Sequence, residues 1–99
     1  MDLRAAFEDT RDLFVAFGDR RRQDIVMTLR DNPNLTVKQV AEAIGLSRPA
    51  TSHHLKILKD AGLLGERQDG RKIYYYPTLG PAFVRLRLLV EASVSAHLP

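Results

Sequence analysis

The sequence predicts a mainly α-helical domain of the α+β class, with about five helices and one two-stranded hairpin. Two observations predict it. Apolar residues recur at helical spacing in several stretches that begin with capping residues, and an Asp69-Gly70 pair precedes a β-branched and aromatic run. With 99 residues, the chain is expected to form a single domain, 1–99, around one modest core.

The stretch 36–62 reads TVKQVAEAIGLSRPATSHHLKILKDAG and predicts two helices joined by a tight turn. Thr36 opens a capping-box pattern, T-x-x-Q, that starts the first helix. Gly45 is expected to end it, because glycine adopts the left-handed conformation after a helix without steric cost. Ser47 is expected to cap the second helix and Gly62 to close it.

The second of these helices is predicted to bury one face and expose a basic one. Thr51, Leu55 and Leu58 follow the spacing of a single face. The other side carries Arg48, Ser52, His53, Lys56 and Lys59. Residues 47–76 hold six Lys and Arg against three Asp and Glu, an excess equal to the net charge of +3 of the whole chain. This arrangement indicates a helix-turn-helix that reads the DNA major groove, although the segment alone is equally typical of a helical hairpin.

Two packing helices are predicted before this unit, over residues 2–17 and 19–32. The first carries an apolar stripe that is expected to lie in the core or in a subunit interface: Leu3, Ala6, Phe7, Leu13, Phe14 and Phe17. The second begins with Arg20-Arg21-Arg22, which could form a phosphate site. Consecutive side chains fan around a helix, however, so we expect the three arginines to pair with neighbouring acids.

Residues 63–76 are predicted to form a two-stranded hairpin. Asp69-Gly70 fits the centre of a type I′ turn, which needs positive φ at both central residues. Three cations bracket the tip: Arg67, Arg71 and Lys72. A basic hairpin directly after a DNA-reading helix indicates a wing that contacts the backbone or minor groove, and a plain surface hairpin is the alternative.

A last helix is predicted over 82–97, after Pro77 and Pro81. It is apolar around much more than one face, which a terminal helix of so small a domain cannot bury alone. The simplest partner is a second copy of the chain, with this helix and the helix over 2–17 packed across a two-fold axis. The predicted dimer interface comprises Leu3, Phe7, Phe14, Phe83, Leu86, Val90 and Val94.

Three segments carry a family resemblance: LFVAFGDRRRQDIVMTL, GLSRPATSHHLKILKDAGLL and QDGRKIYYY. Together they resemble the ArsR/SmtB family of bacterial winged helix-turn-helix repressors. The resemblance implies a homodimer that covers operator DNA at its own promoter and leaves when an inducer binds. Arg20 departs from the pattern, because the family usually has proline there.

The resemblance also implies where metal inducers would bind, and this sequence lacks their ligands. A thiolate site would fall on Thr36 and Lys38 of the first helix of the helix-turn-helix, and neither supplies a thiolate. A zinc site on the last helix would fall on Leu79, Pro81, Ala92 and Ser95, none of which is a metal ligand. We therefore expect no metal or other cofactor, while a site elsewhere or between subunits stays an alternative.

The expected function is a homodimeric repressor on a palindrome with half-sites about 10 bp apart. Arg48, where the family commonly has glutamine, is expected to read a guanine, and a phosphate contact is the alternative. Ser52 and His53 should reach base edges or phosphates, whereas His54 is expected to be half-buried and hydrogen-bonded. Phosphate contacts are expected from Lys56, Arg67, Arg71 and Lys72, and Lys38 is also expected to bind DNA.

Composition argues against other classes. The chain has no cysteine, which excludes a disulfide framework and thiol catalysis, and it has no phosphate-binding glycine loop or G-x-S-x-G motif. No apolar run is long enough to span a membrane or to resemble a signal peptide, so a cytoplasmic protein is expected. A winged helix that binds only protein is the remaining alternative. Three ways of regulation stay open: an organic or inorganic effector between the helices, a protein antagonist, or an autorepressor with no ligand.

Overall fold

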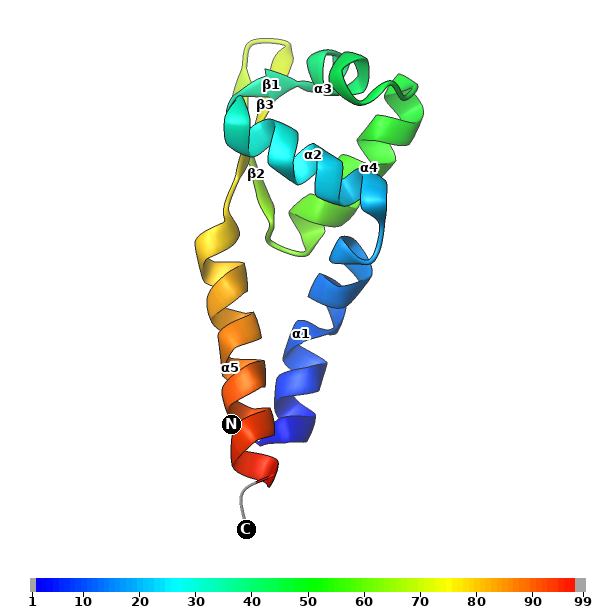
Figure 1. Cartoon of the computed structure of the whole chain (residues 1–99). Coiled ribbons are helices and arrows are strands. Elements are labelled where there is room, and N and C mark those ends of the chain that lie inside the picture. Colours follow the sequence, from blue (N-terminus) through cyan, green and yellow to red (C-terminus); the bar gives the residue numbers. More distant parts are fainter. Residues whose placement is uncertain (1, 98–99) are drawn as a thin grey trace.

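The computed structural model describes residues 2–97, with side chains over 2–95. The molecule is elongated, 54 × 24 × 21 Å, and has two parts (Figure 1). We call residues 20–77 the head and the two terminal helices the stalk. The elements are α1 Leu3–Phe17, α2 Arg20–Asp31, β1 Leu35–Thr36, α3 Val37–Ile44, α4 Arg48–Asp60, β2 Leu64–Asp69, β3 Lys72–Pro77 and α5 Leu79–His97.

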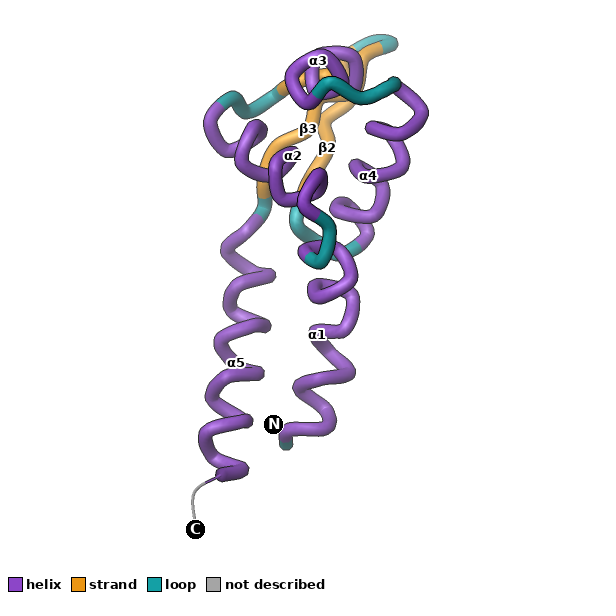
Figure 2. Tube along the Cα trace, turned by 45° about the vertical axis from the view of Figure 1, so that its right-hand side comes forward, coloured by secondary structure: helices purple, strands orange, loops and turns teal. Residues whose placement is uncertain are grey.

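The main core lies in the head, where α2, α3 and α4 pack together beside the small sheet (Figure 2). Its fully buried side chains include Ile25, Leu29, Val40, Leu55 and Leu58. These residues lie at helical spacing within their elements, so each helix contributes one apolar face to the same core. The predicted inward face of α4 is confirmed.

Local capping chemistry fixes both helices of the helix-turn-helix. Thr36 and Gln39 form the predicted capping box at the start of α3, and Gly45 follows that helix with φ 78°. The Ser47 side chain accepts a hydrogen bond from the Ala50 N–H at 3.2 Å and starts α4. After α4, Gly62 has φ 79°, and paired backbone bonds to the last turn complete a Schellman motif. The predicted caps are confirmed.

The sheet has three antiparallel strands in the order β1-β3-β2, whereas the sequence predicted only the two strands of the hairpin. The added strand, β1, is two residues long and pairs Leu35 with Tyr75 and Thr36 with Tyr74. So short a segment carries no periodicity of its own. Its pairing with β3 also depends on a tertiary contact between distant parts of the chain.

The hairpin turn differs from the predicted one. Asp69 pairs with Lys72, so the two central residues are Gly70 and Arg71 rather than Asp69 and Gly70. Only Gly70 of these two has positive φ, 62°, which matches a type II′ turn, with glycine at the first central position, and not type I′. The prediction of type I′ was wrong because an Asp-Gly pair fits either register of the hairpin.

The stalk consists of α1 and α5, which run side by side away from the head (Figure 1). Its smaller core contains Ala6, Leu89 and Ala92, with Leu3 packed against it. The Thr10 hydroxyl is buried and donates to the Ala6 carbonyl at 2.8 Å. No helix among the described residues is long and apolar enough to cross a membrane.

Helix α5 starts at Leu79, three residues before the predicted start at Ala82. The sequence suggested that Pro81 separates this helix from the hairpin, but Pro81 lies inside the first turn. Proline is tolerated there because the first N–H groups of a helix have no intrahelical partner.

Candidate nucleic-acid interface

The exposed face of α4 carries the residues predicted for it. Arg48, Ser52, His53 and Lys56 are all exposed, on the side of the helix away from the core. Thr51 is buried on the inner side, and its hydroxyl donates to the Ser47 carbonyl at 2.8 Å, which satisfies its polar atom. This face is therefore free of core packing and open to an external partner.

A groove of about 770 Å³ lies between α3, the start of α4 and the wing strand β3. Four of the predicted contact residues line it together: Lys38, Arg48, Arg71 and Lys72. Ser52 and Glu42 also line it, and its apolar wall includes Ile73 and Tyr74. The groove brings cations from three separate elements to one place, which suits a polyanion.

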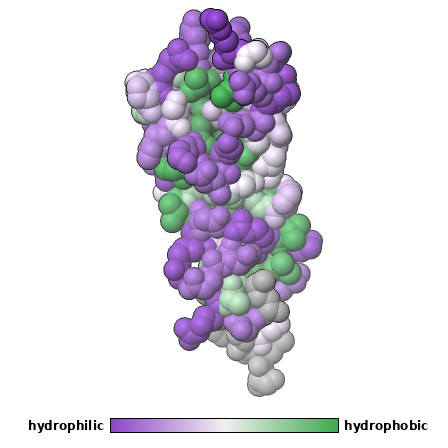
Figure 3. Space-filling model, turned by 180° about the vertical axis from the view of Figure 1, so that it is seen from behind, coloured by the Kyte–Doolittle hydropathy of each residue, from purple (hydrophilic) through white to green (hydrophobic). Residues whose placement is uncertain are grey.

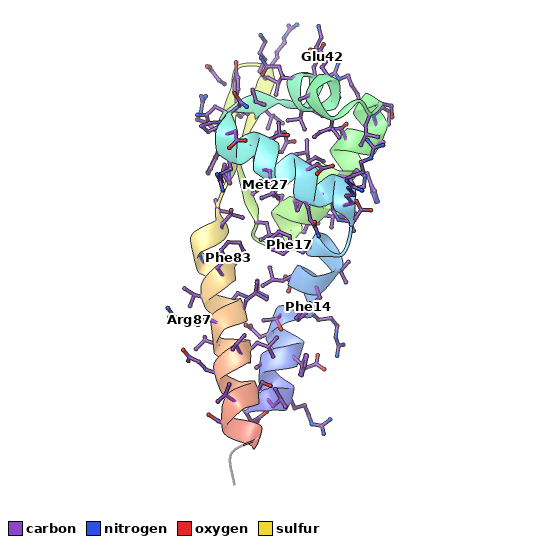
Figure 4. All side chains as sticks on the ribbon, in the orientation of Figure 1. Phe14, Phe17, Met27, Glu42, Phe83 and Arg87 are labelled. Carbon is purple, nitrogen blue, oxygen red and sulfur yellow. The ribbon has the colours of Figure 1, made fainter. Side chains whose placement is uncertain are left out.

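This groove lies at the end of the head opposite the stalk, where α3 and the tip of the hairpin meet (Figure 1). Seen from behind, hydrophilic residues cover most of that end (Figure 3). Figure 4 shows Glu42 there, on α3. Sequence reasoning had not included Glu42, because only the tertiary arrangement places α3 beside the wing.

Other predicted contact residues lie outside the lining of the groove. His53 and Lys56 are on the outer ridge of α4, where the Lys56 ammonium contacts the Asp60 carboxylate at 2.9 Å. The Arg67 guanidinium lies 4.7 Å from the centre of the Tyr74 ring and 3.9 Å from the Asp69 carboxylate. These ion pairs are exposed and therefore weak, so Lys56 and Arg67 can exchange their carboxylate partners for a phosphate.

A further ion pair connects the end of α4 to the wing. The Lys59 ammonium and the Glu66 carboxylate are 2.6 Å apart. This hydrogen bond raises the pKa of Lys59 above its ordinary value. The two residues belong to different elements, so no local sequence pattern indicates the contact. The pair ties β2 to α4 and so helps to fix the wing relative to the helix.

Arg22 connects α4 to the end of α1. Its guanidinium donates to the carbonyls of Val15 at 3.0 Å and Ala16 at 2.8 Å, and lies 3.2 Å from His54 Nδ1. His54 is thus half-buried and hydrogen-bonded, as predicted. The expected pairing with an acid is present, because the Arg22 guanidinium lies 3.9 Å from the Asp19 carboxylate. The carbonyls of Val15 and Ala16 are nevertheless closer partners.

Asp19 has a separate role at the start of α2. Its side chain accepts a hydrogen bond from the backbone N–H of Arg22, and this bond is the main reason that the pKa of Asp19 is lowered. The second arginine of the triplet, Arg21, donates to the Ile44 carbonyl at 3.2 Å. Arg21 therefore ties α2 to α3 within the head, Arg22 ties α2 to α1 and α4, and the two arginines are not arranged as a phosphate site.

The residues predicted for the dimer interface divide into two groups. Five have largely exposed side chains at 47–60%: Phe7, Phe14, Phe83, Val90 and Val94. Leu3 and Leu86 are partly buried inside the chain, against the stalk core and the head core respectively. Phe83 also stacks on Phe17, with ring centres 6.1 Å apart (Figure 4).

The positions at which the resemblance implies metal sites hold residues that are not usual metal ligands. Thr36 and Lys38 are at the start of α3, and Leu79 and Pro81 are in the first turn of α5. Within the described part of the chain, no three His, Asp or Glu residues are grouped so that they could hold a metal ion.

A helix-turn-helix followed by a hairpin, with cations gathered where the two meet, defines the winged helix-turn-helix class of DNA-binding domains. Residues 19–65 match the arsR family of bacterial regulatory proteins. The transcriptional regulator Rv2034 of Mycobacterium tuberculosis is 40% identical over 74 residues, which cover 74% of this chain and 68% of that protein. The transcriptional repressor SdpR of Bacillus subtilis is 36% identical over 63 residues, 64% of this chain and 69% of the repressor.

Solved structures agree with these relatives. The homodimeric winged helix-turn-helix DNA-binding domain of Mb0332 from Mycobacterium bovis superposes with a TM-score of 0.71 at 28% identity. The match covers 96% of this chain and 86% of that domain. The chain belongs to the ArsR family of transcriptional regulators.

Proposed function

We propose that this protein is a homodimeric transcriptional repressor that binds a palindromic operator. The observation that carries the proposal is the groove at the end of the head, where Lys38, Arg48, Arg71 and Lys72 converge from three elements. A repressor, SdpR, and a homodimeric DNA-binding domain, Mb0332, are among the similar proteins and support it. The outer face of α4 enters the major groove, and the wing lies against the adjacent backbone.

Arg48 is the residue that we assign to base reading. It is the first residue of α4 and is exposed at the mouth of the groove. Recognition helices contact base edges with their N-terminal residues, and a guanidinium binds guanine O6 and N7 in a bidentate manner. Ser52, one turn further along, lines the same groove and reaches a base edge or phosphate. The remaining cations neutralise phosphates.

The dimer is assigned to the exposed apolar face of the stalk: Phe7, Phe14, Phe83, Val90 and Val94. Phe7 and Phe14 are seven residues apart on α1, and Phe83, Val90 and Val94 are seven and four apart on α5, so each set lies on one side of its helix. A two-fold axis beside this face buries both sets against their copies. It also places two heads at successive major grooves, about 34–36 Å apart.

The proposal includes no metal inducer, because the aligned positions hold Thr36, Lys38, Leu79, Pro81, Ala92 and Ser95. Soft thiolates or imidazole and carboxylate groups are what such metals need. Release from the operator stays open between an organic or inorganic effector, a protein antagonist and an autorepressor that needs no ligand.

The test is selection of genomic DNA fragments on the purified protein, with Arg48→Ala compared with wild type. We expect a palindrome to be enriched, and the variant to lose about 1–3 kcal/mol of binding and to relax one symmetric base position. Arg30→Ala is the matched control, because the one ion pair of Arg30 among the described residues is an exposed one with Asp31, at 3.7 Å on α2. Equal affinity for all sequences would show that the protein binds DNA nonspecifically. No DNA binding at low salt would favour the alternative of a winged helix that binds only protein.

A further inference from the structure

One arginine joins both stalk helices to the end of the recognition helix. Arg85, on α5, contacts the carboxylates of Asp9 at 3.3 Å and Asp12 at 2.8 Å on α1. Its guanidinium also donates to the Asp9 carbonyl, and its third nitrogen lies 3.5 Å from the Ala61 carbonyl. The side chain is only 30% exposed, so these contacts are partly shielded from water.

The Arg85 guanidinium meets the Ala61 carbonyl at the C-terminal end of α4, where a positively charged donor is favourable. Ala61 follows the last residue of α4, where terminal carbonyls have no partner within the helix and carry partial negative charge. A guanidinium there supplies both a donor and a positive charge. Burial by itself lowers the pKa of Arg85, but hydrogen bonds and charges from Asp12 and Asp9 outweigh it and raise the pKa.

This contact set lies away from the proposed dimer face. On α1, Asp9 is two residues from Phe7, and Asp12 is two residues from Phe14, which places each carboxylate about 200° around the helix from a phenylalanine. The aspartates therefore lie on the opposite side of α1 from the two phenylalanines. Arg85 and its partners remain in place when the apolar face is covered by a second copy.

We infer that Arg85 is a positioning residue that sets the angle between the stalk and α4, and through it the half-site spacing that the dimer accepts. The inference rests on the proposed function and adds to it a determinant of operator geometry. Arg85 does not touch DNA. The stalk fixes one head relative to the other, and Arg85, at the C-terminal end of α4, adds to the Arg22 contacts in fixing the recognition helix relative to the stalk.

The geometry of α4 amplifies any change at this point. The helix has 13 residues and is about 20 Å long, with Arg85 at its C-terminal end and Arg48 at the other. A tilt of about 10° about the C-terminal end moves the far end by about 3.4 Å, which is one base-pair step of DNA. If the contact at Ala61 is loosened, the distance between the two recognition helices varies by about one base-pair step, and the dimer accepts more than one half-site spacing.

The experiment measures spacing selectivity. Wild type, Arg85→Met and Arg85→Lys are titrated against the selected palindrome and against versions whose half-sites are one base pair closer or farther apart. We expect wild type to lose roughly tenfold or more in affinity at either altered spacing, and Arg85→Met to lose less than about threefold while binding the original site more weakly. Arg85→Lys should lie between them, because lysine keeps the charge but not the planar fork of donors.

The matched control is Arg30→Met, on α2 and outside both the stalk and the groove. Arg30 forms an ion pair with Asp31, at 3.7 Å on its own helix, and both side chains are more than 60% exposed. It should keep the wild-type spacing profile. Sedimentation and thermal unfolding establish whether each variant is a folded dimer. If Arg85→Met does not fold, Asp12→Asn, which removes one partner, takes its place with the same expected direction.

A folded dimeric Arg85→Met, or Asp12→Asn in its place, with the spacing profile of wild type overturns the inference. So does an equal change in Arg30→Met. Failure of the proposed function is a different result, since wild type would then prefer no palindrome at any spacing.

Discussion

Helices α4 and α5 both bury one apolar stripe, but what they leave exposed is opposite in character. The exposed side of α4 is polar and basic, and the exposed large apolar residues of the chain include none of its positions. Helix α5 instead exposes Phe83, Val84, Leu88, Val90 and Val94. The buried stripes account for folding, and the exposed faces indicate the partners: a polyanion for one helix and an apolar protein surface for the other.

The same contrast applies to the packing beneath the two faces. The head has a core that is closed by caps, a sheet and fully buried aliphatic residues. The stalk has a core of only a few small residues and one leucine, Ala6, Ala92 and Leu89. Removal of each large side chain from water contributes about 1.5–3 kcal/mol when burial is complete. We therefore expect the stalk to gain more from association than the head.

The largest predicted effect comes from a charge placed on the apolar face of the stalk. Val90→Asp should convert the dimer to a monomer, because an unpaired carboxylate buried in the interface costs several kcal/mol. Operator affinity should fall about a hundredfold or more, since one head then binds one half-site. Analytical ultracentrifugation and operator titration measure the two effects.

Val84→Asp is the matched control for that substitution. Val84 is on the same helix and is 43% exposed, but six residues from Val90 it lies about 120° around the helix. It should leave the dimer intact. Equal loss of dimer in the two variants would place the interface elsewhere on α5, and a dimeric Val90→Asp would remove the stalk face from the proposal.

The parts of the head that the sequence predicted well are those determined by local chemistry. Thr36, Gly45, Ser47 and Gly62 act within one or two turns of their own position, so the capping patterns predict them directly. Strand β1 and the hairpin register depend on pairing with β3, which no local pattern specifies. The predicted turn was consequently one residue out of register.

The candidate site shows the same division. Residue types on the outer face of α4 follow from helical spacing, so the sequence alone places Arg48 and Ser52 on that face. Their convergence with Lys38 and the wing cations in one groove follows from tertiary packing, as does the presence of Glu42. Arg85 and its aspartates are 73 and 76 residues apart, and no pattern in the sequence connects them.

A second prediction separates cations within the groove from those on the ridge of α4. Arg71→Ala should make the fall of log affinity with log salt less steep. The magnitude of the slope should decrease by about 0.9 for each phosphate that is no longer neutralised, and thus by roughly two for a dimer. Lys56→Ala should lower it less, because Lys56 already contacts Asp60 at 2.9 Å and lies outside the groove. Titrations between low and moderate salt measure both slopes. A larger change for Lys56→Ala would place the phosphate track along the ridge.

The smallest predicted effect concerns Glu42, the one carboxylate among the residues that line the cationic groove. Its negative charge repels a phosphate backbone seated there, so Glu42→Gln should raise affinity for all sequences by about two- to fivefold, or roughly 0.5–1 kcal/mol at an exposed site. Glu91→Gln on the stalk, whose partner Arg87 is 3.7 Å away, should leave DNA affinity unchanged. The competing result is weaker operator binding with altered preference at one symmetric position. That outcome would mean that Glu42 accepts a hydrogen bond from a cytosine amine, and that α3 as well as α4 reads bases.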